Sequence, residues 1–400
     1  MGALFLPLPN ASSPTLRLTH ATPTQKLLQS LENSAVWRGP LSVAAYLRRE
    51  KYLENQPLTT SRGITHWVLI DSAEPESPRR RVLCSCQTIR KRALVVREGQ
   101  TQDTIAHCVT NVFCPSQHSR RGYATRMMKE LGNVLGTYQT EESSARSLVF
   151  SALWSDIGKK FYAEHGWEPF PSSHISIPAV SPLPTRGLYS QKHKLKLLRA
   201  SDIGSLCAAD EQNLRKALAV RPPDSPPAIC LVPDHATISW HHAREDFIAT
   251  ELYSRTSEIK GALVSGPEPG QRAWCYWTLS WPGDPHGHHD DLHNHVHGRD
   301  DGKSCNPNTL HILRLAFENA NAQSIEMLLR AAQRYAGLWN MGSVQFWNPS
   351  PEAAEAARRI DLGVQVVDRE EQSIASIKWF GPDGDRVGME WLGNEKYAWC

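Results

Sequence analysis

Two segments in the first half of the sequence hold residues whose types and spacing suit chemistry on an anionic ligand. In the first, residues 112–124, Arg120 and Arg121 precede the small residues Gly122 and Ala124 where a helix is expected to begin. Backbone N–H groups and the dipole of a helix N-terminus attract anions, and small residues let phosphate oxygens approach the backbone. The loop therefore predicts a phosphate or pyrophosphate site, although an ordinary solvated helix start has the same pattern.

The second segment, residues 154–167, places an aromatic pair and a glycine–tryptophan pair around one expected helical turn. Phe161 and Tyr162 are followed at short spacing by Gly166 and Trp167. Glycine commonly ends a helix in a left-handed conformation, so the chain is expected to leave the helix at Gly166 and continue as an extended segment.

Together the two segments resemble the signature motifs of the Gcn5-related N-acetyltransferase superfamily. The second motif matches fully, and the first matches at Gly122 and Ala124, whereas Ser119 stands where glutamine or arginine is usual. More narrowly, the chain resembles the fungal lysine N6-acetyltransferases of lysine catabolism. This narrower resemblance is carried by residues 154–162, 231–235, 240–246 and 394–397, and it covers most of the chain.

The resemblance implies that an amine attacks the thioester of acetyl-CoA directly, without an acyl-enzyme and without a metal. Tyr162 would be the general acid for the departing thiolate, whose reference pKa of about 8.5 lies below the ~10 of tyrosine. His107, with Asp103 behind it, is the candidate base that deprotonates the amine. The alternatives are a packed tyrosine with its hydroxyl in solvent and a structural histidine.

The resemblance also assigns residues that bind the two substrates. Backbone near Cys114 would pair with the pantetheine and polarise the thioester carbonyl. Glu245 and Asp246, on an expected helix, would face the ammonium group of the acceptor, and a solvated helix face with ion pairs is the alternative reading. The residues expected to contact acetyl-CoA are Val112, Phe113, Cys114, Ser119, Arg120, Arg121, Gly122, Tyr123, Ala124 and Tyr162.

Alternating apolar patterns of period two and 3.6 predict the elements that position these residues. They indicate alternating strands and helices, and therefore an α/β (α+β) fold. The resemblance implies that the sheet is mixed, mainly antiparallel and flanked by helices, and that a second lobe is of the same kind. We expect a catalytic domain at 1–171, a linker at 172–190 and a substrate-shaping lobe at 191–400. The second half repeats the order of elements but has no Gly-x-Gly/Ala loop before Ser324, so it is not expected to bind acetyl-CoA.

Composition narrows the function classes. The 44 basic and 41 acidic side chains leave a net charge of +3, too balanced for a chain held to nucleic acid or membranes by charge. No run approaches the ~18 apolar residues of a membrane helix. Nine cysteines, an odd number without a secretory signal, indicate reduced thiols and a cytoplasmic protein.

One histidine-rich stretch stands apart from these motifs. Residues 286–303 hold six histidines among glycines and acids, which on paper suit a metal, but the neighbouring Gly and Pro residues favour a surface insertion. Three alternatives to a lysine acetyltransferase remain: another amine or a protein lysine as acceptor, a non-catalytic coenzyme A-binding protein, and a metal-binding module. A protein acceptor predicts an open groove, whereas a small amino acid predicts a closed pocket with paired charges.

Overall fold

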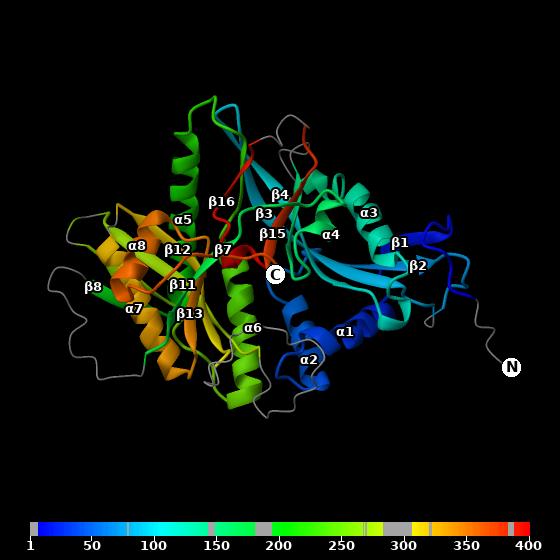
Figure 1. The fold of residues 1–400 in the computed structure, drawn as a ribbon, viewed down its shortest axis with the longest axis horizontal. Coiled ribbons are helices and arrows are strands. Elements are labelled where there is room, and N and C mark those ends of the chain that lie inside the picture. Colours follow the sequence, from blue (N-terminus) through cyan, green and yellow to red (C-terminus); the bar gives the residue numbers. More distant parts are fainter. Residues whose placement is uncertain are drawn as a thin grey trace.

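The computed structural model describes residues 7–77, 80–142, 149–180, 194–266, 268, 270–282, 306–319, 322–382 and 388–400. Two β-sheets lie side by side with helices against them (Figure 1). In this view α7 and α8 lie over the second sheet, α3 and α4 over the first, and α6 lies in the middle of the molecule. The expected fold class, a mixed and mainly antiparallel α/β architecture with two lobes, is confirmed.

The first sheet has nine strands among the described residues. Its spatial order is β1 (Leu16–His20), β2 (Ile64–Asp71), β3 (Cys84–Arg97), β4 (Gln100–Phe113), β5 (Phe150–Ser155), β15 (Ile374–Trp379) and β6 (Glu168–Pro169), with β9 (Ala228–Leu231) beside β3 and β16 (Glu390–Leu392) beside β9. The pairs β4–β5 and β9–β16 are parallel, and the other pairs are antiparallel.

The second sheet repeats this plan with seven described strands. Its order is β14 (Val367–Asp368), β7 (Ser173–Pro178), β13 (Ser343–Trp347), β12 (Thr309–Glu318), β11 (Arg272–Ser280), β10 (Gly261–Ser265) and β8 (Lys194–Leu198). Its parallel pair is β12–β13. Each sheet thus has one parallel pair at its centre, flanked by antiparallel strands.

Caps and apolar periodicity account for the helices. Thr22, Ser42, Asp234 and Ser350 each accept a hydrogen bond from a backbone N–H of the first turn that follows. Apolar side chains spaced three and four apart along α3, among them Met127, Met128, Leu131 and Leu135, are buried against the first sheet. The helices are α1 (Pro23–Trp37), α2 (Val43–Glu54), α3 (Tyr123–Leu135), α4 (Lys160–Ala163), α5 (Ala200–Ala219), α6 (His235–Tyr253), α7 (Ala322–Leu338) and α8 (Pro351–Ile360).

The two sheets exchange strands. Residues 173–178, within the expected linker, form β7 inside the second sheet, where Ile175 and Ile177 are fully buried. In return β9, β15 and β16, from the C-terminal half, complete the first sheet. The sheets therefore do not divide at the linker as the expected domain bounds do.

The sequence also led to expectations about cysteines, membrane-spanning helices and metal ligands. The eight cysteines in the described part of the chain are free thiols. No helix in that part is both long enough and apolar enough to cross a bilayer. The described residues contain no cluster of three potential metal ligands, and the histidine-rich stretch 286–303 lies outside them.

Candidate active site

The site is built where the parallel strands β4 and β5 part. They pair only from Ala106–Cys108 to Phe150–Ala152, after which β4 continues to Phe113 without β5. Just beyond, β4 has a bulge: Ser85 faces Phe113 and Gln87 faces Thr110, so two residues of β4 stand opposite Cys86 alone. One of them, Asn111, has φ +52°. Because a bulge bends its strand, the backbone of residues 111–114 is left free of β5 and faces a cavity.

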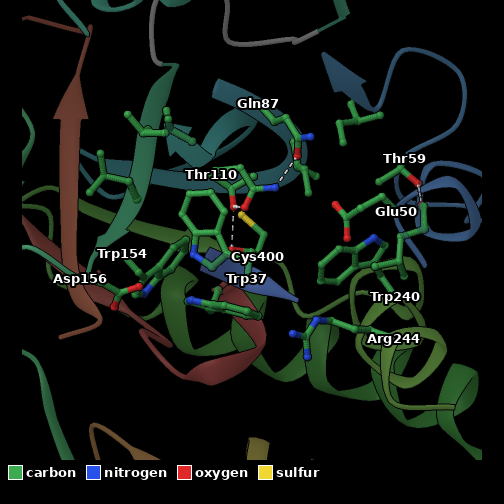
Figure 2. A pocket seen from close by; sticks show the side chains of 18 of the residues that line it. Trp37, Glu50, Thr59, Gln87, Thr110, Trp154, Asp156, Trp240, Arg244 and Cys400 are labelled. Atoms are coloured by element: carbon green, nitrogen blue, oxygen red, sulfur yellow. Dashed lines mark hydrogen bonds between the residues drawn. The ribbon is translucent and has the colours of Figure 1, made fainter. Parts of the chain in front are cut away.

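This cavity has a volume of about 430 Å³ and two chemically different ends. At the strand end it is lined by the predicted residues Val112, Cys114, Ala124 and Tyr162, together with Leu153 and Phe161. The other end is formed by side chains from α1, α2, α6 and the C-terminal segment, namely Trp37, Arg49, Glu50, Trp240, Arg244 and Trp399. Figure 2 labels Trp37, Glu50, Trp240 and Arg244 among them. One cavity therefore joins the predicted coenzyme motif to charged and aromatic groups of both lobes.

The predicted phosphate loop leads from β4 into α3. Gly122 stands before the first turn of α3 with φ +82°, and no described side chain caps the first backbone N–H groups of the helix. Ser119, Arg120, Arg121 and Gly122 are exposed. A left-handed conformation favours glycine, so Gly122 keeps these N–H groups open to an anion.

Two of the predicted coenzyme contacts have other partners. Tyr123 is buried, and its hydroxyl donates to the Pro9 carbonyl at 2.5 Å, so this side chain anchors the loop. Phe113 packs edge-on against Trp37, with 6.1 Å between ring centroids, and does not line the cavity. At these two positions only the backbone remains available to a coenzyme.

Tyr162 lies on the short helix α4 and borders the cavity. Its side chain is 9% exposed, and no described residue hydrogen-bonds its hydroxyl. Burial raises the pKa of the phenol above its ordinary value of 10, so the hydroxyl stays protonated at neutral pH. α4 ends at Ala163, and the turn that follows it closes at Gly166, φ +87°. Trp167 is then fully buried, with its indole N–H donating to Ser151 at 3.0 Å. These contacts fix the position of Tyr162.

The candidate base His107 lies outside the cavity, which corrects the sequence-based assignment. It is 1% exposed, and its Nε2 lies 2.9 Å from the carbonyl oxygen of Tyr138. Burial lowers the pKa of His107 to about 4. Asp103 is also occupied, because it forms an ion pair with Arg215 at the far end of β4. Neither group reaches the parted strands.

Glu245 and Asp246 likewise do not face the cavity. Glu245 is buried and accepts from the Leu279 N–H at 3.0 Å and from Lys260 Nζ at 3.1 Å. Asp246 accepts from the same Lys260 Nζ at 2.7 Å. Residues four apart share a helix face, so α6 presents Trp240 and Arg244 to the cavity and turns the two acids towards Lys260. Glu245 and Asp246, the two residues of α6 that the sequence analysis named, therefore do not line the cavity.

A close carboxylate–imidazole pair beside the cavity was missed by the sequence analysis. Glu54 lines the cavity, and its Oε1 lies 2.6 Å from Nε2 of the buried His66. Its hydrogen bond to His66 holds the pKa of Glu54 below the ordinary value. Gln87, directly opposite His66 in the sheet, accepts from Asn111 at the bulge at 3.0 Å. Strand register aligns His66 with Gln87, and the packing of the end of α2 brings Glu54 to His66, so no sequence motif signals this group.

The segment from Asn394 to Cys400 completes the cavity wall. The buried Lys91 donates to the Ala398 carbonyl at 2.8 Å, and His241 Nε2 lies 3.0 Å from the Tyr397 carbonyl oxygen. Thr110, next to the bulge, donates to the Cys400 carbonyl at 3.1 Å. These contacts hold Trp399 and Cys400 against the cavity.

Comparison with known proteins gives one family model and two curated relatives. The model described as the LYC1 GNAT-like C-terminal domain matches residues 174–400. The uncharacterized protein YGR111W of Saccharomyces cerevisiae is 21% identical over 415 aligned positions, covering 95% of this chain and 96% of its own. A lysine acetyltransferase of Yarrowia lipolytica is 24% identical over 274 positions, covering 60% of this chain and 66% of its own.

Solved structures also match over most of the chain. A GCN5-related N-acetyltransferase from Kribbella flavida has a TM-score of 0.47 at 13% identity, covering 91% of this chain and 72% of its own. A probable N-acyltransferase from Enterococcus faecalis has a TM-score of 0.48 at 9% identity, with the same coverage.

Proposed function

Because the chain belongs to the family defined by the LYC1 GNAT-like C-terminal domain and is an acyltransferase, we propose that it transfers acetyl from acetyl-CoA to the N6-amine of free L-lysine. The observation that carries this proposal is the single cavity that joins the bulged, parted end of β4 to a charged acceptor end. The similarity to the lysine acetyltransferase of Yarrowia lipolytica supports lysine as the acceptor.

The residues present fit acetyl-CoA. The free backbone of Val112 and Cys114 can pair with pantetheine amides, and a backbone N–H there can polarise the thioester carbonyl. The uncapped N-terminus of α3, with Gly122, Arg120 and Arg121 exposed before it, suits the pyrophosphate. Bound acetyl-CoA supplies the activated acetyl group, and no metal is part of the proposal.

Tyr162 is the proposed general acid. Its raised pKa keeps the phenol protonated, so it can donate a hydrogen bond to the departing thiolate. A thiolate with a pKa near 8.5 is a weaker base than this phenolate, so the hydrogen bond stabilises the thiolate without complete proton transfer.

Glu54 and His66 replace His107 as the proposed route for the amine proton. A lysine ammonium, with a pKa of about 10.4, must lose a proton before it attacks. The Glu54 carboxylate lines the cavity with 30% of its side chain exposed, and His66 lies directly behind it. A proton released by the ammonium can therefore pass to this pair directly or through one water.

Thiol release from acetyl-CoA tests the proposal. Free L-lysine, other amino acids, a diamine and a histone-tail peptide are offered in turn, and mass spectrometry locates the acetyl group. We expect turnover with L-lysine and acetylation at N6. If no amine is acetylated while acetyl-CoA still raises the melting temperature, the chain is a non-catalytic coenzyme A-binding protein. A cytoplasmic location and a role in lysine breakdown belong to the same proposal, and cell fractionation checks the location.

A further inference from the structure

Arg244 is a cation without an ion-pair partner at the acceptor end of the cavity. It projects from α6 into the space that Figure 2 shows between Trp240, Glu50 and Cys400. No described residue forms a hydrogen bond or ion pair with its guanidinium, which lies over the Trp399 ring with Cζ 5.8 Å from the centroid. Burial and the neighbouring Arg49 lower the pKa of Arg244 to about 9. A charge held in these surroundings without a partner is costly unless a ligand supplies one.

A second donor on the same face of α6 also lacks an acceptor. Trp240, one turn before Arg244, lines the cavity, and its buried indole N–H has no hydrogen-bond partner among the described residues. Arg49, the other cation that lines the cavity, is already committed, because it donates to Glu50 Oε1 through Nε at 3.0 Å and through Nη2 at 2.8 Å. Arg244 is therefore the cation in this wall that is available to an anion.

Glu50 offers the opposite charge beside Arg244. Its side chain is 16% exposed and lines the cavity, and both hydrogen bonds from Arg49 end on the same oxygen, Oε1. Arg49 thus leaves Oε2 unengaged, and this oxygen can accept from an ammonium group. One end of the cavity accordingly presents a guanidinium for an anion and a carboxylate oxygen for a cation.

We propose that Arg244 binds the α-carboxylate of the acceptor and that Glu50 binds its α-ammonium group, so that the acceptor is a free amino acid. The inference rests on the proposed function and deepens it, because it selects free lysine over a lysine within a protein. In a peptide the α-carboxylate and α-amine are amides, so Arg244 would stay unpaired. A site built to pair a polar group rejects an analogue that lacks it.

Paired substrates test this assignment. L-lysine and L-lysinamide share the reacting amine but differ at the α-carboxylate, and kcat/KM is measured for both at saturating acetyl-CoA. Truncating one partner of a desolvated charge pair costs about 30-fold or more. We expect the unmodified enzyme to prefer lysine by that factor. Arg244→Gln should remove the preference mainly through KM for lysine and leave lysinamide within about 3-fold.

Arg255→Gln is the matched control. Arg255 follows the end of α6 and stacks on Trp339 at 3.9 Å, away from the cavity. We expect this variant to keep the preference for lysine. Arg244→Lys, which retains the charge, should recover part of the preference, and acetyl-CoA binding reports that each variant is folded.

The outcomes separate this inference from the proposed function. Equal turnover of lysine and lysinamide by the unmodified enzyme, or equal loss of both in Arg244→Gln, overturns the carboxylate site and leaves the acetyltransferase standing. If neither amine is acetylated, the proposed function fails, and calorimetry with N6-acetyl-L-lysine then decides the site. Binding that is lost in Arg244→Gln supports it, and absence of binding to the unmodified protein overturns it.

Discussion

In both sheets the central parallel pair of strands separates just beyond a β-bulge, but different side chains occupy the opening. In the second sheet, β12 and β13 pair in parallel only as far as Ile312 and Phe346, as β4 and β5 do in the first. A bulge follows there too, because Leu313 is an extra residue between Ile312, which faces Trp277, and Arg314, which faces Tyr276. Each sheet therefore opens its central strands just beyond a bulge.

What fills the opening differs. Beyond the bulge of β4 the cavity is bordered by Tyr162, whereas beyond the bulge of β12 the carboxylate of Glu395 accepts from the Leu315 N–H at 2.9 Å. Arg314 pairs there with Glu395 and, through two bonds of 2.8 Å, with Asp210. The second cavity, of about 730 Å³, is thus lined by acids that repel phosphates. The fold supplies the opening, and the side chains inside decide whether it can hold a coenzyme.

Removing the phenol of the first opening should have the largest effect. We expect Tyr162→Phe to lower kcat by about 10²–10⁴-fold, the range for a lost general acid, while acetyl-CoA still binds. Thiol release at saturating substrates measures it. Tyr276→Phe, a buried tyrosine at the second bulge whose oxygen accepts from Trp274 at 3.0 Å, is the control and should keep kcat. Equal losses in the two variants would mean that Tyr162 acts only through packing.

Removing the carboxylate of the second opening should affect stability and not coenzyme binding. Glu395→Ala leaves Arg314 with one acidic partner instead of two, and breaking a buried ion pair of this kind costs about 3 kcal/mol. Urea unfolding measures the loss, and calorimetry should still count one acetyl-CoA per chain. Glu258→Ala, which breaks an exposed pair with Arg199, is the control and should change little. If Glu395→Ala bound a second acetyl-CoA, the Glu395 carboxylate alone would account for the difference between the two openings.

Acidification should destabilise both sheets, because each has a neutral buried histidine. Burial lowers the pKa of His107 to about 4 and of His242, bonded to the Trp277 carbonyl, to about 3. In the unfolded chain both bind protons near their ordinary value of 6.5, so stability is full above pH 6.5 and falls as the pH decreases towards the folded-state pKa values. Each histidine should cost about 2 kcal/mol between pH 7 and 5.

Urea midpoints at the two pH values measure this loss. His242→Gln should flatten the pH dependence by one histidine's share, and His107→Gln by a similar amount. A midpoint in the unmodified protein that does not move with pH would show that these histidines are charged or solvated in the folded state.

The smallest expected effect concerns the loop before α3. Gly122→Ala places a Cβ at φ +82° and 3.1 Å from the Cβ of Ala11, and a non-glycine residue in this conformation costs about 1–2 kcal/mol. We expect the KM for acetyl-CoA to rise about 10-fold at an unchanged kcat. Gly270→Ala has a similar φ of +81° with open space around it, and it serves as the control for strain alone. Equal KM values for acetyl-CoA in the two variants would show that the loop before α3 does not bind the coenzyme.

Local patterns predicted the elements well, because each depends on periodicity and caps within a few residues. The helix that begins after the loop, α3, and the extended segment that follows Gly166 are examples. The strand exchange was not predictable, since the pairing of β7 and β15 depends on contacts across most of the chain. The Glu54–His66 pair was hidden for another reason, because it joins the end of α2 to β2 by a packing contact that no local pattern signals.

The assignment of Glu245 and Asp246 to the acceptor was not supported, for a different reason. The run 240–246 is polar on most positions, so hydrophobic periodicity does not say which side of α6 faces the core. Only the packed structure shows that Lys260 forms ion pairs with Glu245 and Asp246, whereas Arg244 lines the cavity.

The pairing of β5 with β15 delays completion of the first sheet during synthesis, because β15 lies far downstream of β5 in the sequence. One edge of β5 stays without its partner until about 200 further residues have left the ribosome, which takes some 10 to 40 s at ~5–20 residues per second. During that interval the nascent chain exposes a fully buried strand to other chains. Yield in a heterologous host should therefore depend on elongation rate and on chaperones that cover this edge.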